Sequence, residues 1–135
     1  MMQQQTLSHW LTVEQVGAVT VVRFAPVKIL ADEAVDEIRA QLFEMVDHDR
    51  RRLLVLNFGS VTGLASRMLG LLVSLHKKLA ALGGQLVLCE VSPFLYQFFE
   101  TANLPGLLCI RGQEQDVLQA LTGLGKTGGP HSYLA

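Results

Sequence analysis

A short apolar run in the middle of the chain most constrains the fold. Residues 53–58 read LLVLNF, between a charged segment at 49–52 and Gly59. The run has the length of a strand, whereas a membrane span needs about 18 or more apolar residues. A strand that is apolar on both faces must be covered on both faces. The run therefore predicts a central strand in an α/β protein.

Further strand-like and helix-like segments alternate along the chain. Residues 11–16 and 19–24 flank a Gly17-Ala18 turn and predict two paired strands, the second ended by Pro26. The other expected strands cover residues 86–91 and 107–110. The expected helices cover residues 32–48, 66–82, 93–101 and 113–121. Residues 59–65 are expected to form a loop.

The helix ends carry start and stop signals. Asp32 and Ser66 are each expected to cap a helix, and Ser92 does the same before a first-turn Pro93. Gly83-Gly84 is the expected stop of the second helix. The expected apolar stripe of that helix is Met68, Leu72, Leu75, Leu79 and Leu82.

This order of elements predicts the architecture. Strands alternating with helices imply right-handed crossovers and a mostly parallel sheet of four to five strands, flanked by about four helices. We expect one domain over residues 10–122 and a loose, glycine-rich tail over residues 123–135. Eight residues are expected in the core: Ile38, Leu42, Leu54, Leu56, Leu72, Leu79, Val87 and Leu88.

Composition narrows the function classes. Half of the 135 residues are hydrophobic, and the net charge is −1. A nucleic-acid binder would carry a basic footprint, so we expect no direct nucleic-acid partner. The N-terminus lacks a secretory signal pattern, which predicts a soluble, cytoplasmic protein without membrane insertion. Cys89 and Cys109 lie in apolar runs and are expected to be buried free thiols.

No pattern points to catalysis, a metal or a cofactor. The four histidines, at positions 9, 48, 76 and 131, lack ligand spacing. Ser66 lies in Leu64-Ala65-Ser66-Arg67-Met68, which lacks the glycines of a nucleophile elbow. Gly125-Lys126-Thr127 resembles the end of a phosphate-binding loop, but Ala120 stands where that motif needs glycine. We therefore expect a protein that is not an enzyme.

The position of Ser66 at an expected helix start has two interpretations. A serine at a helix start commonly accepts a backbone N–H bond and is then a simple cap. The same position tolerates a phosphate, because exposed N–H groups and the positive helix end favour an anion. From the residues alone the cap is the favoured reading, and a phosphate acceptor or contact point is the alternative.

The segment at 53–70 resembles the central signature of the STAS family. In that family a buried strand leads through a short loop to Asp-Ser at a helix start, followed by small and apolar residues. The Gly83-Gly84 turn into the next strand, Ser92-Pro93 and residues 101–104 are also similar to the family pattern. The resemblance covers residues 10 to 121.

The resemblance implies a regulatory protein that resembles bacterial anti-sigma factor antagonists. Such proteins bind an anti-sigma factor, often a serine kinase, and phosphorylation of the serine at this helix start releases the partner. The matching serine here is Ser66. Around this serine the chain departs from the family pattern, with Ala65 replacing the acid, Arg67 a small hydroxyl residue and Met68 a glycine. Residues 25–30 also lack the family's usual Gly-x-Leu-Asp turn.

We therefore expect signal transduction through a partner-binding surface. Its expected residues are Gly63, Leu64, Ala65, Ser66, Arg67 and Met68. Of these, Gly63, Leu64, Arg67 and Met68 are expected to form an exposed, partly apolar patch around an accessible Ser66 hydroxyl. The alternative is a non-phosphorylated STAS subunit of a signalling scaffold or of a lipid or anion transporter. The oligomeric state stays open.

Overall fold

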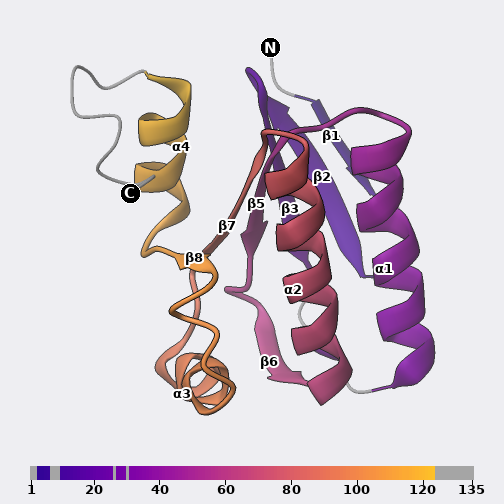
Figure 1. The fold of residues 1–135 in the computed structure, drawn as a ribbon, viewed down its shortest axis with the longest axis vertical. Coiled ribbons are helices and arrows are strands. Elements are labelled where there is room, and N and C mark those ends of the chain that lie inside the picture. The colour runs from indigo at the N-terminus through magenta and orange to yellow at the C-terminus, as the bar shows by residue number, and fades with distance from the viewer. Residues whose placement is uncertain (1–2, 7–9, 26, 30, 124–135) are drawn as a thin grey trace.

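The chain is built on one mixed sheet with helices on both faces (Figure 1). The computed structural model describes residues 3–6, 10–25, 27–29 and 31–123. Pro26 and the segment at 124–135, including Gly125-Lys126-Thr127, lie outside the described residues. The strands are β1 (Gln3–Thr6), β2 (Leu11–Val16), β3 (Val19–Phe24), β4 (Val27–Ile29), β5 (Leu53–Asn57), β6 (Val61–Leu64), β7 (Gln85–Cys89) and β8 (Cys109–Ile110). The helices are α1 (Asp32–Asp47), α2 (Ser66–Ala81), α3 (Pro93–Thr101) and α4 (Glu114–Thr122).

The central strand of the sheet is the one that the sequence predicts. The strand order is β1-β2-β3-β5-β7-β8, and β5 pairs parallel with both of its neighbours, β3 and β7. The β7–β8 pair is also parallel, whereas β2 runs antiparallel to β3. The predicted α/β class, with a mostly parallel sheet and four helices, is confirmed.

Three strands were not expected from the sequence. β1 pairs antiparallel with β2 at one end of the sheet. β4 and β6 form a separate two-stranded parallel sheet, so the expected loop at 59–65 contains a strand. These strands are three or four residues long, too short for an alternation of apolar and polar residues to show them.

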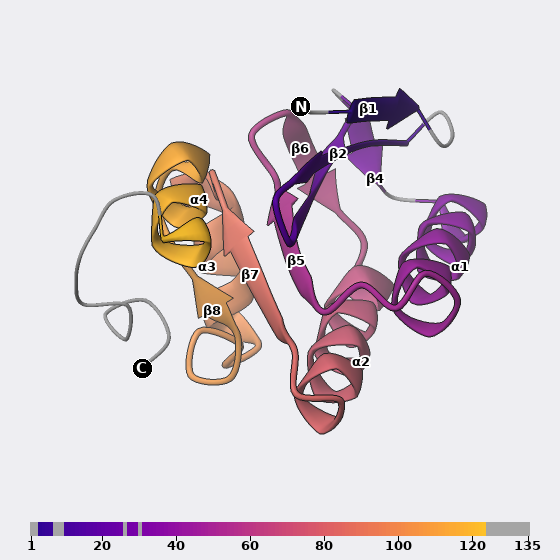
Figure 2. The same cartoon turned by 90° about the horizontal axis from the view of Figure 1, so that it is seen from above.

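The sheet separates two apolar layers. α1 and α2 lie side by side on one face, and α4 lies on the other, as Figure 2 shows from above. Alternate residues of β5 enter opposite layers, since Leu54 and Leu56 pack in the larger cluster and Val55 in the smaller one under α4. All eight residues predicted for the core are at most 1% exposed.

Leu82 is a correction to the predicted stripe of α2, because its side chain is 45% exposed. The helix ends at Ala81, and Leu82 is the residue that caps its C-terminus. Gly83 then adopts a φ of 79°, and the N–H groups of Gly83 and Gly84 donate to the carbonyls of Ala80 and Leu79. This arrangement confirms the glycine pair as the stop signal.

Two of the three expected helix caps are wrong. Ser92 caps α3, because its Oγ accepts the Leu95 N–H at 3.2 Å. Asp32 and Ser66 instead occupy the first helical positions, since the extended residues before them are Ala31 and Ala65. Neither alanine has a side-chain oxygen, so both helix starts lack a side-chain cap.

A polar cluster joins α4 to three strands. The Arg23 guanidinium on β3 pairs with Glu14 at 2.7 Å and with Glu114 at 2.5 Å. The Asn57 side-chain amide also donates to Glu114, at 2.6 Å. Burial raises the pKa of Glu114, but the hydrogen bonds from Arg23 and Asn57 outweigh burial and hold the pKa below its ordinary value.

We expect Leu56→Ala to lower the free energy of unfolding by about 2–5 kcal/mol, because the truncated side chain leaves a cavity in the core. Leu56 has no exposed surface. Urea unfolding followed by circular dichroism measures the change. A loss below about 1 kcal/mol would contradict the central position of β5.

We expect Gly84→Ala to destabilise the protein by about 1–3 kcal/mol. A Cβ at this position would lie 2.3 Å from the Arg52 backbone oxygen, which cannot move without disturbing the start of β5. Gly70→Ala is the matched control, because a Cβ there meets nothing within 4 Å. The control should stabilise α2 by up to about 1 kcal/mol. In thermal unfolding, Gly84→Ala should therefore lower the melting temperature and Gly70→Ala should raise it.

Glu114 is expected to make stability depend on pH. Its pKa is lower in the folded protein than the ordinary value of 4.5, so its contribution is present above that pH and is lost as the pH falls through the folded pKa. The difference in unfolding free energy between wild type and Glu114→Gln should therefore be largest near neutral pH and shrink in acid. A difference that stays constant from pH 7 to about pH 3 would contradict this role.

Candidate functional site

The candidate site lies where the chain leaves the central strand. Phe58 follows β5, is buried, and packs against Phe24 and Phe99 with ring centroids 4.9 and 6.1 Å apart. Its carbonyl accepts the Val61 N–H at 3.1 Å, which closes a turn that leaves Gly59 and Ser60 exposed. The aromatic anchor thus holds the base of the loop while its tip faces solvent.

The two-stranded sheet positions the start of α2. β6 pairs with β4, with Leu64 opposite Ile29. Directly after this pair, the Ala65 N–H donates to the Ile29 carbonyl at 2.7 Å. The helix therefore begins from a backbone that is hydrogen-bonded to a neighbouring strand, and this places Ser66 at a defined point of the surface.

Ser66 is exposed and occupies the first helical position of α2. Its hydroxyl makes no cap hydrogen bond to the helix. The first turn of α2 contains no acidic residue, so the unpaired N–H groups there keep their partial positive charge. The accessible serine at this helix start is thus present in the structure, but it is not the capping residue.

Arg67 links α2 to the first helix. Its guanidinium contacts Asp36 at 2.8 Å and Asp32 at 3.2 Å, both on α1. Hydrogen bonds to Asp36 and then to Asp32 raise the pKa of Arg67 above its ordinary value. The positive charge next to Ser66 is therefore shared with two carboxylates.

Asp32 and Asp36 were not among the expected site residues. The predicted order of elements contained a signal for their proximity to Ser66. α1 and α2 both begin at the carboxyl ends of parallel strands, so their first turns meet at the same edge. The particular pairing needs a contact between residues 31 positions apart, which a linear pattern does not contain.

The expected exposed patch is wrong for Leu64 and Met68. Leu64 is 8% exposed and Met68 is 0% exposed, and both belong to the main core cluster. Strict alternation along β6 would put Leu64 on the same face as the exposed Thr62, but the burial pattern departs from alternation at the end of the strand, and Leu64 packs in the core. Met68 lies on the core face of α2 with Leu71 and Leu72. A partner therefore cannot contact either side chain at the surface.

The remaining residues define what we call the β6–α2 surface. Four of the expected site residues belong to it, since Ser66 and Arg67 are exposed and Gly63 and Ala65 are partly exposed. The full surface consists of Gly59, Ser60, Thr62, Gly63, Ala65, Ser66 and Arg67. Because these side chains are small apart from Arg67, a partner could approach the backbone of the loop and of the helix start closely.

Neither cysteine forms a disulfide. Cys89 has no exposed surface, and burial, followed by Glu114 and Glu90, raises its pKa to about 12. Cys109 is only partly buried, which corrects one half of the expected pair, and burial raises its pKa as well. Both thiols are therefore protonated near neutral pH and are poor nucleophiles.

The described part of the chain contains neither a cluster of metal-ligating side chains nor a helix of membrane-spanning length. There, no group of three or more His, Cys, Asp or Glu side chains could hold a metal ion. The described helices also include none with the length and apolarity of a bilayer span, since the longest, α1 and α2, have 16 residues each.

Solved structures share this fold. A protein from Thermotoga maritima, described as a candidate anti-sigma factor antagonist, is 18% identical over 82% of this chain and 92% of its own, with a TM-score of 0.72. The anti-sigma factor antagonist SpoIIAA of Bacillus, in its unphosphorylated form, is 18% identical over 91% and 99%, with a TM-score of 0.64. A part of the murine anion transporter Slc26a9 is 15% identical over 90% of this chain and 22% of its own, with a TM-score of 0.64.

The sequence model of the STAS domain matches residues 11–117. That match takes in the main sheet from β2 onward, the segment at 59–65 with β6, and the start of α4. Because it covers most of the 135 residues, and because the fold agrees with it, the chain belongs to the STAS domain family.

Proposed function

We propose that this chain is a regulatory protein-binding module of the anti-sigma factor antagonist type. It docks through the β6–α2 surface onto an anti-sigma factor or a protein like a serine kinase. The observation that carries this proposal is the exposed Ser66, held at the first turn of α2 by the β4–β6 pair and free of any capping bond. The domain that acts in this way spans residues 10–122.

Docking relies on the shape and rigidity of the surface more than on apolar area. The small residues Gly63, Ala65 and Ser66 allow a partner backbone to come close. The packing of Phe58 against Phe24 and Phe99 keeps the base of the loop in one conformation. Preorganisation of this kind lowers the ordering cost of association. Arg67 and its two carboxylates form a charged rim that would favour one orientation of the partner.

Phosphorylation of Ser66 is the proposed switch. A phosphate adds a charge of about −1.5 to −2 at the centre of the surface. Asp32 and Asp36 already engage Arg67, so the nearest cation is only partly available to offset the new charge. Burying that charge against a partner would cost several kcal/mol, and the phosphorylated form would dissociate.

The proposal is not enzymatic. Docking of this kind requires no cofactor or metal. We propose that the protein acts in the cytoplasm, where anti-sigma factors and sigma factors act. The two thiols are protonated, and Ser66 lacks the glycine-flanked turn of a hydrolase nucleophile. Its role in transcription regulation follows from partner binding alone.

A second candidate is a non-phosphorylated STAS subunit of a signalling scaffold or of a lipid or anion transporter. The match to one part of a murine anion transporter favours it, as does Ala65, which stands where the family carries an acid. A pull-down with the full chain as bait, read by mass spectrometry, separates the candidates. An anti-sigma factor or kinase supports the first, and a permease or scaffold protein supports the second.

We expect Ser66→Asp to weaken binding of the captured anti-sigma factor by at least about tenfold, because the added charge is buried without a free counter-charge. Ser66→Ala should bind like wild type and keep its stability within about 0.5 kcal/mol, since no cap bond is lost. Isothermal titration calorimetry with the purified partner measures both affinities.

The matched control for this test is Gln115→Asp, which adds one negative charge at an exposed position of α4. This variant should bind like wild type. If Ser66→Asp also binds like wild type, the β6–α2 surface is not the interface. If it binds weakly while the partner kinase leaves Ser66 unmodified, docking stands and the phosphorylation switch is wrong.

A further inference from the structure

The tip of the loop before β6 is held by a side chain of the central strand. The Asn57 Oδ1 accepts the Gly59 N–H at 2.7 Å. The fit is tight, because a Cβ at Gly59 would lie 3.0 Å from the same oxygen and 3.4 Å from the Glu90 Cβ. Gly59 and Ser60 are exposed and belong to the β6–α2 surface, whereas Asn57 is half-buried. Asn57 is therefore placed to support that surface from beneath.

A carboxylate on α4 orients the Asn57 amide. The Asn57 Nδ2 donates to Glu114 at 2.6 Å, and the Arg23 guanidinium donates twice to Glu114, at 3.1 and 2.5 Å. The lowered pKa keeps Glu114 ionised near neutral pH, so its carboxylate can only accept hydrogen bonds. The Gly59 N–H can only donate. The amide therefore has one favourable orientation, with its NH2 group toward α4 and its oxygen toward the loop.

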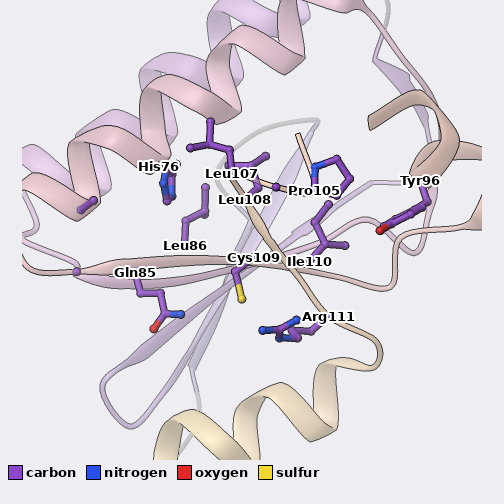
Figure 3. Close-up of a pocket in the computed structure, with 13 residues that line it drawn as sticks. His76, Gln85, Leu86, Tyr96, Pro105, Leu107, Leu108, Cys109, Ile110 and Arg111 are labelled. Atoms are coloured by element: carbon purple, nitrogen blue, oxygen red, sulfur yellow. The ribbon is translucent and has the colours of Figure 1, made fainter. Parts of the chain in front are cut away.

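The start of α4 is tied to the loop tip by a second route. The Glu114 N–H donates to the Glu90 carboxylate at 2.8 Å, and the Glu90 side chain lies close to Gly59. The cavity of about 440 Å³ between α2 and β8 includes none of these residues (Figure 3). Their polar groups pair with one another and do not line that cavity, which favours a positioning role over the binding of a ligand.

We propose that Asn57 is a positioning residue of the docking surface, whose amide couples α4 to the loop and holds Gly59 and Ser60 in the conformation that a protein partner recognises. This role rests on the function proposed for the β6–α2 surface. It assigns part of the partner's affinity to Asn57 and Glu114, which lie outside that surface. A fixed loop tip loses less freedom on association than a mobile one, so loss of the coupling lowers affinity.

The coupling requires an amide at position 57. Asn57→Asp keeps the shape of the side chain but puts a second carboxylate at the 2.6 Å contact with Glu114, where like charges repel. The side chain should then turn away and release the Gly59 N–H. Glu114→Gln removes this conflict, because a glutamine amide can present its oxygen to an asparagine or its NH2 group to an aspartate.

The test is a double-mutant cycle of Asn57→Asp and Glu114→Gln, with affinity for the captured anti-sigma factor measured by isothermal titration calorimetry. We expect Asn57→Asp alone to weaken binding about tenfold, and the double variant to bind within about threefold of Glu114→Gln alone. Val117→Ala is the matched control, since it truncates a buried apolar side chain of α4 and keeps every polar group of the coupling. This control should bind like wild type.

A second measurement needs neither a partner nor a variant. In the wild-type protein, NMR should show the Gly59 amide exchanging with solvent at least about tenfold more slowly than in an unstructured peptide of the same sequence, although Gly59 is exposed. Asn57→Asp should abolish this protection, and the double variant should restore it. An unprotected Gly59 amide in the wild-type protein would show that Asn57 does not hold the loop.

Failure of this role and failure of the docking function are distinguishable. If Ser66→Asp weakens binding while Asn57→Asp binds like wild type, the surface is the interface and the positioning role of Asn57 is wrong. If Asn57→Asp weakens binding and the double variant recovers nothing, the coupling through Glu114 is wrong. If Ser66→Asp and Asn57→Asp both bind like wild type, the docking function itself is wrong, and the role of Asn57 falls with it.

Discussion

The structure depends on the burial of β5 from both faces. Leu54 and Leu56 enter the layer under α1 and α2, and Val55 enters the layer under α4. The strand is hydrogen-bonded to β3 on one side and to β7 on the other, so none of its backbone groups needs water. Both layers of helices therefore take their positions from one five-residue strand. Loss of that strand would remove side chains from both apolar layers at once.

The parallel arrangement also explains where the candidate site lies. Parallel strands end at the same edge of the sheet, and the helices that follow them begin there. The first turns of α1 and α2 consequently meet, which brings Asp32 and Asp36 to Arg67. The β4–β6 pair adds a second hydrogen-bonded support at that edge. A serine at this helix start is thus held on a rigid frame, although the segment contains several small residues.

Much of the fold could be predicted from the sequence, and the errors have identifiable causes. The β5 run, the glycine stop at Gly83 and the Ser92 cap are local signals, and the structure confirms them. The predicted caps at Asp32 and Ser66 were wrong by one position, since the N-cap residues are Ala31 and Ala65. The position of a cap depends on the backbone conformation of the residue before the helix, which the sequence does not show. β6 was missed because its pairing with β4 joins segments more than 30 positions apart.

The sequence by itself determined the class of the fold, its central strand, its core residues and the family, because periodicity and short-range signals encode them. Helical periodicity already placed Met68 on the apolar face of α2, but only the tertiary structure showed that Leu64 is buried too and that neither side chain belongs to the exposed surface. Leu64 and Met68 lie within two positions of Ser66, yet they are buried while Ser66 is exposed. That difference arises from the direction in which β6 and α2 turn their side chains against the rest of the core. The ion pairs of Arg67 likewise depend on neighbours that are distant in the chain.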